Sequence, residues 1–150
     1  MNKDEVLNES RCSFISVSSN EAFARAVAAA FCAQMNPTYD EISDIKCAVS
    51  EAVTNAIVHG YRDQVGEITM IMKISEKRIF RVEIRDRGCG IADIEEAMHP
   101  LYTTDPENER SGMGFTIIEN FMDTLRVLSA PGRGTRVIMT KKLSLLPRSR

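Results

Sequence analysis

One stretch of the sequence, from Ser50 to Gly60, carries a carboxylate and an amide that could meet the same ligand. On a helix, Glu51 lies almost opposite the apolar stripe, and Asn55 and His59 follow at steps of four residues. A carboxylate can accept a proton from a hydroxyl or from water, and an amide oxygen is a ligand for a hard cation. Taken alone, the same pattern is more typical of a solvated helix face.

A second candidate is the run from Asp86 to Gly90, which reads Asp-Arg-Gly-Cys-Gly. Asp86 continues the inward parity of an alternating apolar segment, and an inward carboxylate needs a partner because an unpaired buried charge is costly. The exocyclic amine of adenine is such a donor, and Gly88 and Gly90 would let the backbone approach a flat ligand. An ordinary strand-ending turn with an aspartate cap is the alternative.

The third candidate is a pair of glycines, Gly112 and Gly114, which open an apolar-periodic segment. Exposed N–H groups at the start of a helix favour phosphate oxygens, and Arg110 just before them could neutralise phosphate charge. A surface arginine is the more common finding. The pattern is neither the full dinucleotide fingerprint nor a Walker A loop, so a Rossmann fold and a P-loop are unsupported.

The elements that must position these residues follow from periodicity and from turn signals. Two helices are expected first, one from about Ser18 to the Asn36-Pro37 pair and one from Thr38 or Asp40 to Gly60. The remaining predictions are strands at 14–17, 68–74, 80–84, 125–128 and 135–140, a helix after Gly114, and a polar connection over 91–111 with a possible short helix at 93–98.

This order of elements predicts an α+β fold, a two-layer sandwich in which helices cover one face of a mixed, mostly antiparallel sheet of four or five strands. Arg81, Glu83 and Arg85 should fill the uncovered face, as in a sheet with one solvated side. With 150 residues, the chain is expected to form one domain, residues 1–150.

Composition narrows the class of function. A formal net charge of −2 argues against direct binding of nucleic acid through a broadly basic surface. The four cysteines are widely spaced and, with two histidines, complete no zinc pattern. Neither a signal sequence nor an apolar run long enough to span a membrane is present, so a cytoplasmic protein with no membrane partner is expected.

Taken together and in this order, the motifs resemble those of the ATPase superfamily of gyrases, chaperones, histidine kinases and mismatch-repair proteins. Glu51, Asn55 and His59 are similar to its N box, Asp86 to Gly90 to its first glycine box, Gly112 to Gly114 to its second, and Gly134-Thr135 to its last turn. The resemblance extends over about 18–140. The stretches 51–61 and 109–123 resemble more closely the anti-sigma F factors, a family of serine-protein kinases in spore-forming bacteria.

The resemblance implies a Bergerat-type ATP-binding fold with an ATP lid at about 91–111, ATP or ADP and Mg²⁺ as ligands, and a homodimer. That dimer would inhibit sporulation sigma F and phosphorylate an anti-anti-sigma protein on serine. The implied roles are Glu51 as the catalytic base, Arg110 at the terminal phosphate, Asn55 as the magnesium ligand, Asp86 as the adenine acceptor, and further nucleotide contacts from Gly88, Gly90, Thr103, Thr104, Ser111, Gly112, Met113, Gly114 and Thr135.

The sequence departs from the family's usual composition at Arg87 and Cys89, which fill variable positions of the first glycine box; altered nucleotide affinity is the expected effect. A nucleotide-gated sigma-binding module with little or no kinase activity is the main alternative, although Glu51 speaks against it. A histidine-kinase catalytic domain is a third hypothesis, for which the expected membrane or dimerisation-helix segment is lacking.

Overall fold

A computed structural model describes residues 3–92, 98 and 114–145. Its sheet has five strands in the order β1-β2-β3-β5-β4, and all four pairings are antiparallel. The strands are β1 (Val6–Ile15), β2 (Glu67–Ser75), β3 (Ile79–Asp86), β4 (Thr124–Ser129) and β5 (Thr135–Lys142). The expected mostly antiparallel sheet is therefore confirmed.

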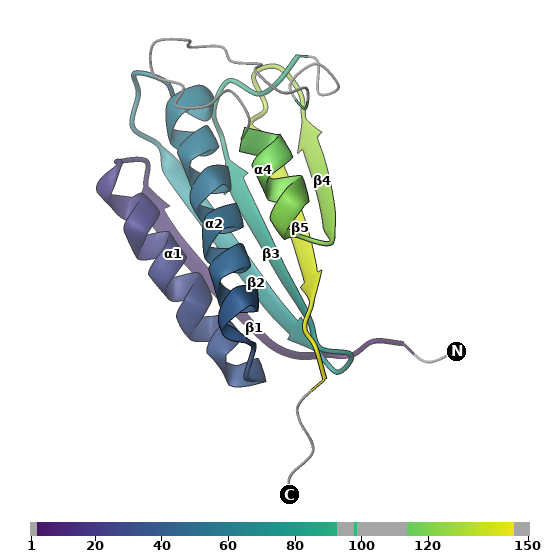
Figure 1. The fold of residues 1–150 in the computed structure, drawn as a ribbon. Helices are drawn as coiled ribbons and strands as arrows, with labels where there is room; N and C mark the ends of the chain where they lie inside the picture. The colour runs from purple at the N-terminus through teal and green to yellow at the C-terminus, as the bar shows by residue number, and fades with distance from the viewer. Residues whose placement is uncertain (1–2, 93–97, 99–113, 146–150) are drawn as a thin grey trace, which may run out of the picture.

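Helices cover one face of this sheet (Figure 1). They are α1 (Ser19–Cys32), the short 3₁₀ helix η1 (Ala33–Met35), α2 (Tyr39–Asn55), the π-helical turn η2 (Ala56–Gly60) that continues α2, and α4 (Gly114–Phe121). The long helix α2 lies between α1 and α4 and contacts both. This arrangement confirms the predicted two-layer α+β architecture.

Helix α2 begins where the sequence predicts it, because Thr38 and Glu41 form a capping box. The Thr38 hydroxyl accepts a hydrogen bond from the N–H of Glu41 at 3.1 Å, and the Glu41 carboxylate accepts one from the N–H of Thr38 at 2.8 Å. The other Glu41 oxygen accepts the N–H of Ser144 at 2.7 Å, which joins the start of α2 to the segment after β5.

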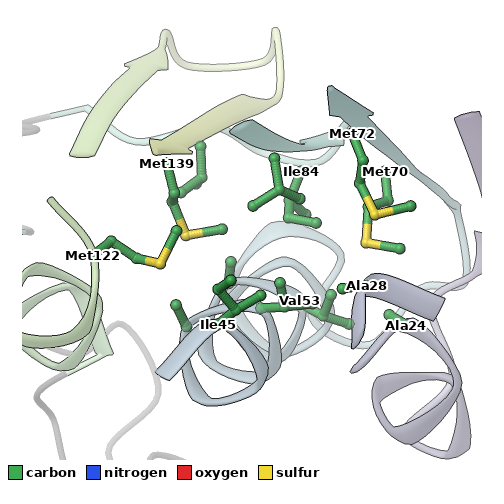
Figure 2. Packing of buried hydrophobic residues seen from close by; sticks show 14 of the residues in the cluster. Ala24, Ala28, Ile45, Val53, Met70, Met72, Ile84, Met122 and Met139 are labelled. Atoms are coloured by element: carbon green, nitrogen blue, oxygen red, sulfur yellow. The ribbon is translucent and has the colours of Figure 1, made fainter. Parts of the chain in front are cut away.

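Alternation along the strands builds the core. The inward side chains of the central strands are buried and face the helices; Met70, Met72, Ile84 and Met139 are each at most 1% exposed. Figure 2 shows these residues across from Ile45 and Val53 of α2, with Met70 and Met72 on the side of Ala28 of α1. Removing this apolar surface from water is the main force that holds the helical layer on the sheet. None of the described helices is long and apolar enough to cross a membrane.

Two expectations need correction. The strand predicted at 14–17 overlaps only the end of a longer strand, β1, which starts at Val6, ends at Ile15 and pairs with β2 along its length. Glu83 was expected on a solvated face, but it is only 1% exposed because arginines surround it. The possible short helix at 93–98 and nearly all of the segment 91–111 lie outside the described residues.

Candidate functional site

Asp86 stands at the last position of β3, where its carboxyl group is enclosed by backbone. The residue is 8% exposed, and one carboxylate oxygen accepts a hydrogen bond from the N–H of Gly88 at 2.8 Å. On the other side lies Gly60, where an added Cβ would be 3.0 Å from the carboxyl carbon and from both oxygens. The predicted inward orientation of Asp86 is therefore confirmed, and only a glycine leaves this much room beside it.

The enclosure changes the acidity of this group. Burial raises the pKa of Asp86 above its ordinary value of 3.8, while the N–H groups of Gly88 and Thr135 oppose this rise by donating hydrogen bonds to the carboxylate. A buried acceptor of this kind gains from any further donor that reaches it.

The glycines of the Asp86–Gly90 loop permit close contact between backbone segments. A Cβ on Gly88 would lie 2.0 Å from the carbonyl oxygen of Gly60, and one on Gly90 would lie 2.0 Å from that of Ala130. Gly90 also has a φ of +76°, which L side chains rarely adopt. The neighbours that demand glycine here belong to the protein's own backbone, whereas the sequence pattern was interpreted as room for a flat ligand.

Thr135 faces Asp86 directly, because the two residues are partners in the register of β3 and β5. The side-chain oxygens of Thr135 and Ser129 lie 2.8 Å apart, and the Ser129 hydroxyl also donates to the carbonyl of Gly134 at 2.8 Å. A Cβ on Gly134 would lie 2.1 Å from the Asp86 carbonyl oxygen. Asp86, Gly88 and Thr135, three of the predicted site residues, therefore form one cluster.

The π turn η2 joins this cluster to helix α2. Its bonding pattern includes a hydrogen bond of 3.0 Å from the N–H of Tyr61 to the carbonyl of Ala56, five residues earlier. The carbonyl of Gly60 in turn accepts the N–H of Cys89 at 2.8 Å. Single π turns inside α-helices often occur at functional sites. Here the turn brings the end of the helix against the first glycine loop.

Glu51 and Asn55 lie on the last turns of α2, and both side chains are half-buried. Four residues of α-helix place them about 6 Å apart along the axis. The neighbouring alanines at positions 48, 52 and 56 are at most 4% exposed, so the small residues form part of the core rather than an open flank. Helix α2 thus leads from Glu51 and Asn55 through η2 to the Asp86 cluster.

Several predicted site residues lie outside the described part of the chain: Arg110, Thr103, Thr104, Ser111, Gly112 and Met113. Gly114 is the first residue of α4. Across the described residues, no group of three or more His, Cys, Asp or Glu side chains is placed to hold a metal ion.

Sequence reasoning missed Tyr61, a buried residue (8% exposed) whose hydroxyl group stabilises the backbone next to the site. Its hydroxyl accepts the N–H of Arg87 at 2.7 Å and donates to the carbonyl of Glu67. A tyrosine directly after a helix-ending glycine was the available signal, since a buried tyrosine hydroxyl usually finds a partner.

Comparison with known proteins places this geometry in context. Residues 16–141 match the family model described as "Histidine kinase-like ATPase domain". The chain is 56% identical over 137 residues to an anti-sigma F factor of Oceanobacillus iheyensis, covering 91% of this chain and 94% of that protein. It is 50% identical over 139 residues to the anti-sigma F factor of Clostridium acetobutylicum, with 93% and 96% covered.

A solved structure supports the fold. The structure of the RsbU and RsbW domains of Rv1364c from Mycobacterium tuberculosis superposes with a TM-score of 0.66 at 20% sequence identity. The match covers 91% of this chain and 32% of that one. At this identity the similarity concerns the arrangement of helices and strands.

Proposed function

The chain belongs to the histidine kinase-like ATPase domain family and, within it, to the anti-sigma F factors, and on that premise we propose that it is an ATP-using protein-serine kinase as well as an anti-sigma factor. Its partners would be a sigma F factor, which it binds and inhibits, and an anti-anti-sigma protein, which it phosphorylates on serine. We further propose that it acts as a homodimer in the cytoplasm.

The observation that carries nucleotide binding is the enclosed carboxylate of Asp86. It is 8% exposed and lies among Gly60, Gly88 and Thr135 at the meeting point of α2, β3 and β5. A carboxylate in such a place recognises a planar ligand through a donor such as the exocyclic amine of adenine, and a donor there would offset part of the cost of burial. Asp86 is accordingly the proposed adenine acceptor, and Gly88, Gly90 and Thr135 shape the site around it.

The catalytic assignments rest on helix α2. Glu51 is the proposed base, which orients the incoming serine hydroxyl and accepts its proton, since positioning and charge neutralisation account for most of the catalysis of phosphoryl transfer. Asn55, one turn later, is the proposed magnesium ligand; its amide oxygen suits a hard cation that takes its other ligands from phosphate and water. That ion would neutralise charge on the transferred phosphoryl group.

The remaining assignments belong to the segment before α4. Arg110 is proposed to meet the terminal phosphate, and Thr103, Thr104, Ser111, Gly112 and Met113 are proposed to contact the nucleotide together with Gly114, at the start of α4.

The test is a transfer assay with labelled ATP, Mg²⁺ and a candidate anti-anti-sigma protein. Glu51→Gln keeps the size of the side chain and removes the base, so transfer to serine should fall by at least about 100-fold while ATP binding persists. Glu119→Gln is the matched control, because Glu119 is an exposed glutamate on the neighbouring helix α4. It should transfer phosphate like the unaltered protein.

Each outcome separates one part of the proposal from the others. ATP binding with no transfer by the unaltered protein, under conditions in which it still binds sigma F, supports the nucleotide-gated module without kinase activity. Equal transfer by Glu51→Gln and by the unaltered protein overturns the base assignment. Failure to bind ATP at all overturns the nucleotide-binding function.

A further inference from the structure

The uncovered face of the sheet carries a hollow that none of the proposed functions uses. Its volume is about 490 Å³, and its lining includes five arginines, at positions 11, 85, 87, 133 and 136. Two acidic residues, Glu67 and Asp86, also border it. The carboxyl group of Asp86 is directed away from the hollow, because it is held against Gly60 on the helical side. The hollow is therefore strongly basic.

Asp86 and Thr135 border both the hollow and the candidate nucleotide site, but Arg85 and Arg136 lie on the opposite face of the sheet from Glu51 and Asn55. Arg85 and Arg136 are register partners, and both alternate with buried residues, Ile84 on β3 and Val137 on β5, which face the helices. Their side chains therefore project from the face of the sheet that is opposite to Glu51 and Asn55. A ligand in the hollow would contact the reverse side of the strands that carry Asp86.

Two of these arginines, Arg85 and Arg136, are held in place by Glu83. The carboxylate of Glu83, 1% exposed, accepts two hydrogen bonds from Arg136, at 3.0 Å from Nε and 3.1 Å from Nη2, and a further one from Nε of Arg85. A guanidinium fixed by such a fork loses little side-chain entropy when it binds a ligand with its remaining N–H groups. Glu83 thus prepares Arg85 and Arg136 for a ligand, while it neutralises only part of their charge.

The other arginines bring charge that the protein does not neutralise. Arg87 and Arg133 are exposed, and neither forms an ion pair with a carboxylate of the described residues. Arg11 lies 4.0 Å from Glu9, and both side chains are largely exposed, so that pair is weak. Three guanidinium groups are thus available at the rim.

From this arrangement we propose that the hollow is a binding site for a small phosphate-type polyanion of the diphosphate class. Its volume falls in the range of sites for small molecules, and guanidinium groups pair with phosphate oxygens through two parallel hydrogen bonds. An anion with two phosphoryl groups can reach the fixed pair, Arg85 and Arg136, together with an arginine of the rim. Arg85 and Arg136, which would hold the anion, have no role in the proposed nucleotide site, so the inference goes beyond the proposed function.

The experiment is a titration of the full chain with inorganic diphosphate in the absence of Mg²⁺, followed by calorimetry and by the amide chemical shifts of residues 129–136. One diphosphate per chain should bind, with affinity that falls as ionic strength rises. Arg133→Ala and Arg11→Ala each remove one rim charge and should weaken binding about tenfold. Both side chains are exposed, so these variants should fold normally.

Arg126→Ala is the matched control, because Arg126 is exposed on the same face of the sheet but does not line the hollow. It should bind diphosphate within about twofold of the unaltered protein. Equal losses of diphosphate affinity in Arg133→Ala and Arg126→Ala would show that only the general surface charge attracts the anion, and would overturn the proposal.

A competition experiment separates this site from the nucleotide site. Diphosphate should bind with the same affinity when excess ADP fills the nucleotide site, since Arg85 and Arg136 project from the opposite face of the sheet. Displacement of diphosphate by ADP would assign the anion to the nucleotide site and overturn the inference, while the proposed kinase function would stand. Absence of diphosphate binding by the unaltered protein would also overturn it.

Discussion

The carboxyl group of Asp86 lies so close to Gly60 that a methyl group added to the glycine would be 3.0 Å from both carboxylate oxygens. The end of the π turn η2 and the end of strand β3 therefore pack directly against each other. Since the two elements carry different parts of the proposed site, substitutions at their junction should affect nucleotide binding and stability in separable ways.

Gly88→Ala should loosen this junction. Its Cβ would lie 2.0 Å from the carbonyl oxygen of Gly60, a clash with backbone that only a shift of the loop can relieve. We expect a loss of about 3 kcal/mol in the free energy of unfolding and weaker ATP binding. Urea denaturation and equilibrium nucleotide binding measure the two effects.

Gly132→Ala is the control for that substitution, because an added Cβ there meets nothing within 4 Å. Its φ of +74° still makes alanine unfavourable, by about 1 kcal/mol. ATP binding should be unchanged. If Gly132→Ala weakens ATP binding as much as Gly88→Ala does, the contact between Gly88 and Gly60 is not what shapes the site.

Asp86→Asn should weaken ATP binding without lowering the stability of the folded protein. Because burial raises the pKa of Asp86 in the folded protein, its contribution to stability is greatest below the unfolded value, 3.8, and is lost as pH rises through the folded pKa. At pH 7 the ionised group is therefore a cost, and asparagine should leave the free energy of unfolding equal or higher. ATP affinity should fall at least about tenfold through loss of the acceptor.

The control for Asp86→Asn is Asp63→Asn, at an exposed position after η2. It should change neither quantity. A marked loss of stability in Asp86→Asn alone would mean that the hydrogen bonds from Gly88 and Thr135 outweigh the burial of charge.

Glu83→Gln should alter the acid denaturation of the protein. Burial alone would raise the pKa of Glu83, but the hydrogen bonds and charges of Arg136 and Arg85 outweigh it and lower the pKa from 4.5 to about 2. The resulting stability is present above pH 4.5 and is lost as pH falls toward 2. The variant should be less stable at pH 7 by about 2 kcal/mol.

The pH dependence gives the decisive measurement for Glu83. The difference in unfolding free energy between the variant and the unaltered protein should shrink as pH falls from 4.5 toward 2. Glu76→Gln, an exposed glutamate in the β2–β3 turn, should show no such trend. If this difference in unfolding free energy does not depend on pH, the ion pairs of Glu83 are not its cause.

Thr38→Ala should weaken the start of α2. The substitution removes the hydroxyl that accepts the N–H of Glu41 and so breaks half of the capping box, at a cost of about 1 kcal/mol. Thermal unfolding measures it, and Thr38→Ser, which keeps a hydroxyl, should recover most of the loss. Equal losses in the two variants would assign the effect to the methyl group of Thr38.

Much of the fold could be predicted because local signals agreed with the tertiary structure. The cap at Thr38 and the alternation of side chains along β2 and β3 are each specified by residues that lie only a few positions apart in the sequence. Asp86 was placed correctly by the same alternation, since side-chain parity along a strand fixes which face a residue occupies.

Other features depend on contacts between distant residues. The start of β1 was missed because this edge strand is largely exposed, so polar and apolar residues are both tolerated along it. The burial of Glu83 comes from Arg136, 53 positions later, and only the β3–β5 register brings the two together. The assignments at Arg110 and its neighbours stay predictions, since they lie outside the described residues.

The π turn η2 makes the geometry of the site depend on a count of residues. An α-helical path over the same segment would close each ring one residue earlier, and each residue of helix turns the chain by about 100°. The same residues wound as an α-helix would therefore carry Gly60 out of its position against Asp86, whereas the π turn accommodates the extra residue and keeps the glycine there. In this segment, chain length is specified as strictly as chemical identity.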